Sequence, residues 1–355
     1  MRAPGDIPVE TQLAAPSVAA TGKKIATFRR ALLRWYDEQR RDLPWRKTRD
    51  PYRIWLSEIM LQQTRVAAVL EHYRIFLDRY PDLEALAAAP EDAVLAAWSG
   101  LGYYRRARML HRCAKELVEK HGGRLPQRAE LLQTLPGIGR YTAAAIASIA
   151  FGEPIAVVDG NVERVLRRLD GCDLTQPQTW QHAQLILNTD RPGDFNQSMM
   201  ELGATICLPR DPTCPTCPVK QWCVTQVSAQ HFEKMERRAL LPGGAPAPIA
   251  SRRVKKEIWC SLDQRDSHIR FVQRPRKSSL MPGMWELPLQ QKPRRTKVPT
   301  FWRTFRHSIT VTDFTVHVHR GPRSSAKGKW IPAANISHLP ITGLTRKILK
   351  AAGII

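Results

Sequence analysis

The apolar positions between residues 23 and 206 recur with the spacing of helices. Over 23–40 they fall at Ile25, Phe28, Leu32, Leu33 and Tyr36, which is helical spacing. The same pattern predicts helices over 52–64, 66–80, 105–121, 141–151, 162–169, 180–188 and 195–206, with short helices between 81 and 98. No stretch of this region alternates with the period of two that a half-buried strand needs. We therefore predict a mainly α fold for this part of the chain.

Beyond residue 250 the pattern changes. It predicts strands over 258–262, 269–272 and 308–318, and a closing helix over 342–350. A charged stretch and the run L-P-G-G-A-P-A-P predict a linker over 226–250. Residues 1–22 have little apolar bulk, so we expect a disordered tail there. The predicted organisation is a helical core over 23–225 and a small α/β domain over 251–355.

The net charge of +23 on this 355-residue chain is unevenly distributed. Residues 251–355 contain 22 Lys or Arg and 5 Asp or Glu, a net charge of +17, whereas residues 1–250 contribute +6. This excess predicts a polyanionic partner, with nucleic acid as the default and an acidic membrane surface as the competitor. The sequence contains no apolar run of membrane-spanning length and no signal peptide, so we expect a cytoplasmic protein without a membrane partner.

The stretch L-P-G-I-G-R-Y-T-A at 135–143 separates two predicted helices. Pro136 and Gly137 favour a sharp turn, and Gly139 leaves the backbone without a Cβ where the next helix begins. Such a hairpin beside a helix N-terminus can bind a phosphate through backbone N–H groups. It can equally be an ordinary helical corner, and the hairpin alone does not decide between the two.

Asp159 lies eighteen residues beyond Tyr141, directly before Gly160 and Asn161 and the next predicted helix. Its carboxylate is either the N-cap of that helix or a reactive group held at a cleft.

Four cysteines lie close together at Cys207, Cys214, Cys217 and Cys223. The set has one close pair between two single residues, whereas a structural zinc site more often has two close pairs. Four thiolates in one short loop suit a cubane iron–sulfur cluster, with zinc as the alternative and four unrelated buried thiols as the simplest one. Because so short a loop cannot bury a core, a metal group would hold it together.

The hairpin, Asp159 and the cysteine spacing together resemble the helix–hairpin–helix DNA glycosylases of the endonuclease III type. The motifs L-S-E-I-M-L-Q-Q-T at 56–64, G-L-G-Y-Y at 100–104 and D-F-N-Q-S-M-M-E-L-G at 194–203 narrow the resemblance to the adenine DNA glycosylases of the MutY family. The resemblance implies a base excision repair enzyme that removes adenine opposite 8-oxoguanine or guanine. It also implies a 4Fe-4S cluster on the four cysteines, a double-stranded DNA partner, and a monomer at the nucleoid of a bacterial-type cytoplasm.

The resemblance assigns the chemistry to two carboxyl groups. Glu58 lies in an apolar helix, where burial would favour the neutral acid, and it would protonate adenine at N7. An exposed Glu on an amphipathic helix is the alternative interpretation. Asp159 would stay ionised and stabilise the positively charged sugar, or form a transient adduct with it. Asn161 and Tyr141 match positions that orient these groups.

Tyr141 also occupies the position at which strand-cleaving relatives carry a Lys nucleophile. A phenol cannot form an imine, so the resemblance implies a monofunctional enzyme that leaves an abasic site.

The resemblance places further residues around the DNA. The expected adenine pocket consists of Trp45, Arg46, Gln197 and Glu201. The expected DNA contacts are Gln62, Gln63, Tyr103, Tyr104, Gly137 and Gly139. Tyr103 and Tyr104, followed by basic residues, suit stacking on bases together with phosphate contact. A packed aromatic pair beside a solvated basic helix is the alternative, and chemistry alone does not separate Tyr103 from Tyr104.

The C-terminal segment resembles the Nudix-like domain of the same family through V-Q-R-P at 272–275 and L-M-P-G-M-W-E-L-P at 280–288. A Nudix hydrolase needs several carboxylates for its metal ions, but from residue 281 onward the only acids are Glu286 and Asp313. We therefore expect this domain to bind and not to hydrolyse. The expected lesion-recognition stretch consists of Phe305, Arg306, His307 and Ser308. Arg306 stands where the family has Ser.

Overall fold

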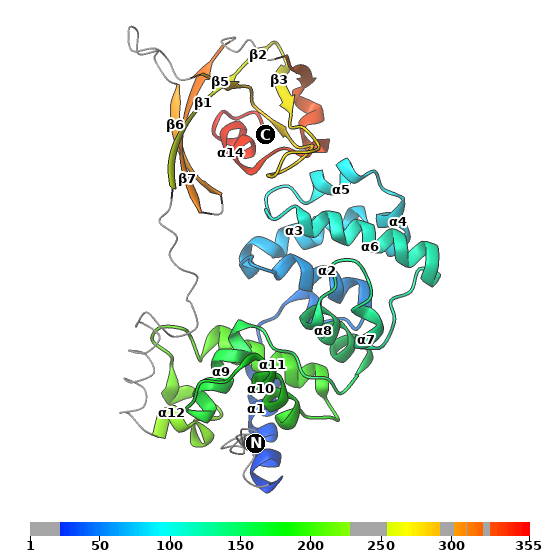
Figure 1. Ribbon diagram of the computed structural model, residues 1–355, viewed down its shortest axis with the longest axis vertical. Coiled ribbons are helices and arrows are strands. Elements are labelled where there is room, and N and C mark those ends of the chain that lie inside the picture. Colours follow the sequence, from blue (N-terminus) through cyan, green and yellow to red (C-terminus); the bar gives the residue numbers. More distant parts are fainter. Residues whose placement is uncertain (1–21, 228–253, 292–301, 310, 322–326) are drawn as a thin grey trace, which may run out of the picture. The chain divides into compact units, whose positions relative to one another are not determined.

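The computed structural model describes residues 22–227, 254–291, 302–309, 311–321 and 327–355 (Figure 1). The predicted tail and almost all of the predicted linker lie outside these residues. The chain divides into two compact units. The first takes its described residues from Met1–Arg49, Gln127–Leu132 and Gly139–Leu241, and the second from Asp50–Pro126, Gln133–Ile138 and Pro242–Ile355.

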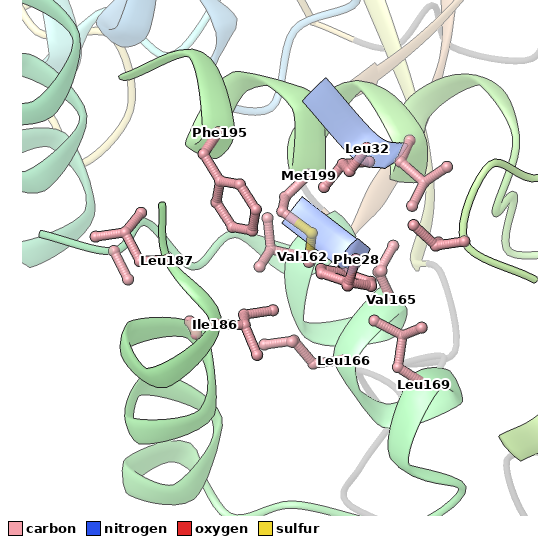
Figure 2. Packing of buried hydrophobic residues seen from close by; sticks show 14 of the residues in the cluster. Phe28, Leu32, Val162, Val165, Leu166, Leu169, Ile186, Leu187, Phe195 and Met199 are labelled. Carbon is pink, nitrogen blue, oxygen red and sulfur yellow. The ribbon is translucent and has the colours of Figure 1, made fainter. Parts of the chain in front are cut away.

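The first unit is helical. It contains α1 (Gly22–Gln39), η2 (Pro44–Arg46), α7 (Ala129–Leu132), α8 (Arg140–Phe151), α9 (Gly160–Asp170), α10 (Gln176–Ile186), α11 (Pro192–Thr205), η3 (Cys214–Thr216), η4 (Lys220–Trp222) and α12 (Val224–Val227). Figure 2 shows its core, where apolar side chains of α1, α9, α10 and α11 meet. Helix α9 contributes four side chains to this core, because their spacing places them on one face of the helix: Val162, Val165, Leu166 and Leu169.

Five helices of the second unit precede the hairpin. They are α2 (Pro51–Leu61), α3 (Val66–Arg79), α4 (Leu83–Ala88), α5 (Glu91–Ala97) and α6 (Arg105–His121). Asp50 caps α2 through hydrogen bonds from two backbone N–H groups, and buried Phe76 packs edge-on against Trp98 with ring centroids 5.9 Å apart. The predicted helices are thus confirmed to within a few residues. The described residues 22–227 contain no strand.

The rest of the second unit is built on short sheets. Its elements are β1 (Val254–Leu262), β2 (Gln264–Arg265), β3 (His268–Gln273), β4 (Trp285–Glu286), β5 (Leu289–Gln290), β6 (Arg303–Ile309), β7 (Thr312–Arg320), β8 (Lys329–Pro332), η5 (Ala333–His338) and α14 (Gly343–Ala351). One sheet has the order β5-β1-β7-β6, with β1 parallel to β7, and the other joins β2, β3 and β4, with β8 on β3. The expected helical core with a smaller, sheet-containing C-terminal region is confirmed.

The prediction of a single strand over 308–318 is wrong. The chain turns between β6 and β7, and the two strands pair antiparallel, with Ser308 opposite Asp313. Phe305 on β6 and Val316 on β7 are partners in this register, and both side chains are buried. The run 302–320 contains no glycine or proline, the residues that most often mark a turn, so the sequence did not reveal it.

No helix in the described part of the chain is long and apolar enough to cross a membrane.

Candidate active site and nucleic-acid interface

The glycine hairpin is closed by a hydrogen bond from the backbone N–H of Ile138 to the carbonyl of Leu135, at 3.2 Å. Gly137 has a φ of +79°, and a Cβ there would lie 2.6 Å from the Cβ of Met109. Glycine is therefore required at 137 on two grounds. At Gly139, a Cβ would meet no atom within 4 Å, so its absence is not needed for packing. Gly139 begins α8 without a side-chain cap, which leaves an N-terminus suited to binding an anion.

Asp159 is the N-cap of α9, as one of the two interpretations of the sequence required. Its Oδ1 accepts hydrogen bonds from the backbone N–H groups of Asn161 (2.9 Å) and Val162 (2.7 Å). Its Oδ2 accepts a third from the side-chain amide of Asn161, at 2.9 Å. Three donors at a helix N-terminus stabilise and orient the charged carboxylate, which is half-buried. The N-cap role and a role in chemistry are thus compatible.

Arg164, which sequence reasoning missed, extends this network. Its guanidinium donates to the side-chain oxygen of Asn161 (2.9 Å), the carbonyl of Gly203 (2.7 Å) and the carbonyl of Cys207 (2.9 Å). A Cβ on Gly203 would lie 2.6 Å from the Cβ of Asn161, so glycine lets α11 approach the start of α9 this closely. A continuous chain of hydrogen bonds therefore joins Asp159 to the first residue of the cysteine loop.

Glu201 on α11 is the centre of a buried ionic cluster. It is 1% exposed and accepts four hydrogen bonds, three from Arg41 and one from Arg46. Burial alone would raise the pKa of Glu201, but the hydrogen bonds and the charges of the two arginines lower it to about 2. The structure thus joins two predicted pocket residues, Arg46 and Glu201. Arg41 was missed because nothing near it in sequence marks it as their partner.

The other predicted residues of the first unit lie in less polar surroundings. Trp45 is buried in the turn η2, next to Arg46. Gln197 on α11 is half-buried. The half-buried Tyr141, in the first turn of α8, donates its hydroxyl to the sulfur of Met200 at 3.5 Å. A thioether sulfur is a weak hydrogen-bond acceptor.

Glu58 belongs to the second unit and lies in the last two turns of α2. Its side chain is 6% exposed, and Ile54, Trp55 and Ile59 around it on the helix are buried as well. The alternative of an exposed Glu on an amphipathic helix is therefore wrong. Glu58 is therefore a buried carboxyl group on a rigid helix.

The two tyrosines of the G-L-G-Y-Y motif differ in burial. Tyr103 is 56% exposed, whereas Tyr104 is 6% exposed and donates its hydroxyl to the carbonyl of Ile341 at 3.2 Å. Burial raises the pKa of Tyr104. Only Tyr103 is thus free to stack on a base without leaving a packed position.

A cavity of about 1020 Å³ in the second unit brings the predicted DNA contacts together. Gln62, Gln63 and Tyr103 line it, as do Gly137 and the basic residues Arg105, Arg106 and Arg108. The loop at 279–282 and residues 307–309 line it as well. Aromatic, amide and guanidinium groups around one concave surface are the chemistry of a nucleic-acid interface.

The predicted lesion-recognition stretch is part of strand β6. Phe305 is 7% exposed and belongs to the apolar core, whereas Arg306 and Ser308 are exposed. Burial, followed by the charge of Lys347, lowers the pKa of the half-buried His307. Arg306, His307 and Ser308 are therefore available to a ligand, and His307 is neutral near pH 7.

The four clustered cysteines surround one small cavity of about 30 Å³. Arg168 also lines it, and its guanidinium donates to the sulfur of Cys207 at 3.3 Å. In the described part of the chain, no group of three or more His, Cys, Asp or Glu side chains is arranged to hold a metal ion. Of the remaining cysteines, Cys113 and Cys260 are buried, whereas Cys172 is exposed.

Comparison with known proteins gives a consistent result. Residues 56–187 match the family of HhH-GPD superfamily base excision DNA repair proteins. The chain is 39% identical to the human protein named adenine DNA glycosylase over 337 residues, which cover 81% of this chain and 62% of that one. It is 30% identical to the adenine DNA glycosylase of Buchnera aphidicola subsp. Schizaphis graminum over 92% of this chain and 99% of that one.

A solved structure described as a thermostable thymine-DNA glycosylase is 34% identical, with a TM-score of 0.56. The match covers 59% of this chain and 99% of that one. The chain thus spans less than two thirds of the human relative's length and nearly all of the bacterial one's.

Proposed function

The chain belongs to the adenine DNA glycosylases of the HhH-GPD superfamily of base excision DNA repair proteins, and from this premise we propose that it hydrolyses the N-glycosidic bond of adenine in double-stranded DNA. The observation that carries the proposal is the carboxylate of Asp159, oriented by three hydrogen bonds at the start of α9. Because the target base lies inside a duplex, the enzyme extrudes it before reaction.

In this proposal Asp159 acts on the sugar. Breaking the glycosidic bond leaves positive charge on the deoxyribose, and a carboxylate fixed in advance stabilises that charge without having to reorient. Asp159 can also form a transient covalent adduct with the same carbon. Asn161 holds the carboxylate through its backbone and side-chain N–H groups, so it is a positioning residue.

Glu58 acts on the base. Adenine is a poor leaving group until it is protonated, and a buried, neutral carboxyl group is suited to donating that proton at N7. Glu58 ends as a carboxylate, which can then orient the attacking water. The division of two carboxyl groups into one acid and one anion follows from their surroundings, apolar for Glu58 and rich in hydrogen-bond donors for Asp159.

The remaining groups of the first unit would shape the adenine pocket. Glu201 stays ionised and keeps the guanidinium of Arg46 in place, next to Trp45. Gln197 supplies an amide with both a donor and an acceptor for the edge of a base. Tyr141 cannot act as an amine nucleophile, so the product is an abasic site in an intact strand.

The second unit would read the opposite strand. Tyr103 stacks within the duplex beside Gln62 and Gln63, while Gly137 and Gly139 present backbone N–H groups to phosphates. Arg306, His307 and Ser308 contact 8-oxoguanine or guanine opposite the adenine. Arg306 adds a positive charge and several donors where the family has a hydroxyl group.

The residues of the cysteine loop fit a 4Fe-4S cluster. Cys207, Cys214, Cys217 and Cys223 surround one cavity, the number of thiolates that such a cluster takes. When bound, the cluster would supply structural cross-links and no chemistry at the base. Arg164 would then connect the position of Cys207 to Asn161 and so to Asp159.

The proposal is tested by incubating the purified protein with labelled duplexes that carry adenine opposite 8-oxoguanine, adenine opposite guanine, or thymine opposite guanine. The products are treated with alkali and sized on a gel. We expect cleavage after alkali at adenine in the first two duplexes and intact strands without alkali. Cleavage of the thymine duplex alone would favour the activity named for the structural relative. Strand cleavage without alkali would contradict the monofunctional assignment.

A further inference from the structure

We propose that Arg106 is a positioning residue that holds the two halves of the base-stack wedge, Gln62–Gln63 and Tyr103, as one rigid unit. Arg106 lies in the first turn of α6 and forms hydrogen bonds both to the end of α2 and to the loop before Tyr103. The inference rests on the proposed function, because it assigns a structural cause to the extrusion of adenine.

One end of the guanidinium closes helix α2. The last carbonyl groups of a helix have no partner within it and need a donor from elsewhere. The Nη1 of Arg106 donates to the carbonyls of Ile59 (2.7 Å), Met60 (2.9 Å) and Gln62 (2.6 Å). A positive charge at this end also complements the helix dipole. Arg106 therefore fixes the point at which α2 passes into the first half of the wedge.

The other end of the same group reaches the loops on both sides. Its Nη2 donates to the hydroxyl of Thr64 (3.1 Å) and, at longer range, to the carbonyls of Leu101 and Gly102 (3.4 Å each). Thr64 follows Gln63, and Gly102 precedes Tyr103. The planar guanidinium of Arg106 thus forms hydrogen bonds at both halves of the wedge.

The face of the guanidinium adds a third connection. Its central carbon lies 5.3 Å from the ring centroid of Tyr103 and 5.4 Å from that of buried Trp98. These are cation–π distances. The exposed Tyr103 ring therefore has a fixed neighbour inside the protein, which restricts the directions in which it can point.

The backbone is strained at both halves of the wedge, which explains why Arg106 is needed to hold them. Gln63 has a φ of +56° and Tyr103 a φ of +47°, in the left-handed region that residues other than glycine rarely adopt. Strained residues persist when their surroundings hold them, and they gather at functional sites. The hydrogen bonds of Arg106 end beside both of them. Arg106 and the two strained residues therefore form one arrangement, in which the hydrogen bonds of Arg106 hold the strained backbone. This arrangement exists before DNA binds.

The burial of Arg106 separates this role from phosphate contact. Burial lowers the pKa of Arg106 to about 10, and its buried Nε has no hydrogen-bond partner in the described structure. The hydrogen bonds of its two terminal nitrogens end on the wedge or its flanks. Arg105 and Arg106 both line the cavity, but Arg105 is exposed. Arg105 is therefore the matched control, because it can pair with a phosphate.

The experiment compares wild type, Arg106→Lys, Arg106→Ala and Arg105→Ala on a duplex with 2-aminopurine at the target adenine position. Three quantities are measured: the fluorescence rise on extrusion, the single-turnover excision rate with ordinary adenine, and the slope of log affinity against log salt. A lysine keeps the charge and can bond the end of α2, but it cannot also reach Thr64 or stack as a plane. We expect Arg106→Lys to lose roughly tenfold or more in extrusion and excision, with an unchanged salt slope.

Arg105→Ala should reduce the salt slope by about one, because it removes one phosphate contact, and Arg106→Lys should not share that change. If Arg106→Ala does not fold, Arg106→Lys carries the test. Extrusion and excision by Arg106→Lys at wild-type rates would overturn this inference but not the proposed function. A salt slope that falls in an Arg106 variant as much as in Arg105→Ala would do the same. A wild-type protein that neither extrudes nor excises adenine would overturn the proposed function and the wedge together.

Discussion

In the first unit, the polar side chains of the candidate site sit on helix ends and accept several hydrogen bonds each. Asp159 accepts three and Glu201 accepts four. In the second unit, the groups assigned to DNA recognition sit in left-handed turns, as Tyr103 does, or on an edge strand, as Arg306 does. Glu58 is the exception in the second unit, because it is buried on a helix.

The difference follows from what each group has to do. A reacting group loses rate when it is misplaced by about an ångström, so it is best attached to a rigid element and held by its neighbours. A recognition group has to meet a surface that varies, and loops positioned by a scaffold serve that purpose. Substitutions in the first unit should therefore change the rate of excision or the stability, and substitutions on β6 should change the choice of partner base.

Among substitutions in the first unit, the largest effect is expected at Asp159. Asp159→Asn keeps the shape and removes the charge, so single-turnover excision should fall on the order of a hundredfold or more. DNA affinity should survive, because phosphate contacts supply most of it. A single-turnover rate close to wild type would contradict the catalytic role of Asp159 at the start of α9.

Glu201→Gln tests the rigidity of the first unit. It leaves Arg41 and the nearly buried Arg46 without their anion, and the free energy of unfolding should fall by about 2–4 kcal/mol. The pKa of Glu201 is lowered from 4.5 to about 2, so its stabilisation is complete above pH 4.5 and is lost as the pH falls toward 2. Urea unfolding of both proteins between these pH values checks this, and an equal acid sensitivity of the two would contradict it.

Cys217→Ser tests whether the cysteine loop of the first unit depends on a metal cluster. Anaerobically purified wild type should contain about four irons per chain, and the variant should lose them. Its DNA binding should weaken more than the helical signal of its circular dichroism. Cys172→Ser, at an exposed cysteine outside the loop, is the control and should keep its iron. Stoichiometric zinc without iron in wild type would refute the cluster assignment.

The smallest effect is expected on β6. Arg306→Ser restores the family's hydroxyl, and we expect a few-fold change in the preference for 8-oxoguanine over guanine, as is usual for a single exposed contact. The excision rate of bound substrate should stay the same. Arg303→Ser is the matched control, because residues 303 and 306 of a strand point to opposite faces. An equal change in both variants would show that charge, and not this position, sets the preference.

The sequence predicted the elements that depend on local patterns of residues, above all the helices. Helix α6 has the predicted bounds, because Tyr104 and Gly122 flank a run with a strong helical period. The turn between β6 and β7 was missed, because no glycine or proline marks it in the run 302–320. The partners Arg41 and Arg164 were also missed, since each acts on residues far from it in the chain or on backbone carbonyls. For Arg106, the sequence indicated a phosphate contact and not a positioning role. Only the exposed fractions of the two side chains in the structure separate Tyr103 from Tyr104, and two adjacent tyrosines in a sequence do not contain that information.

The central claim is that a buried Glu58 protonates adenine while Asp159 stabilises the sugar. The most direct test is mass-spectrometric detection of free adenine in single-turnover reactions of wild type and Glu58→Gln on the duplex with adenine opposite 8-oxoguanine. Glutamine fills the same space but cannot donate the proton. The account predicts adenine release by wild type, none by Glu58→Gln, and equal DNA affinity of the two. Release by Glu58→Gln at the wild-type rate would contradict it.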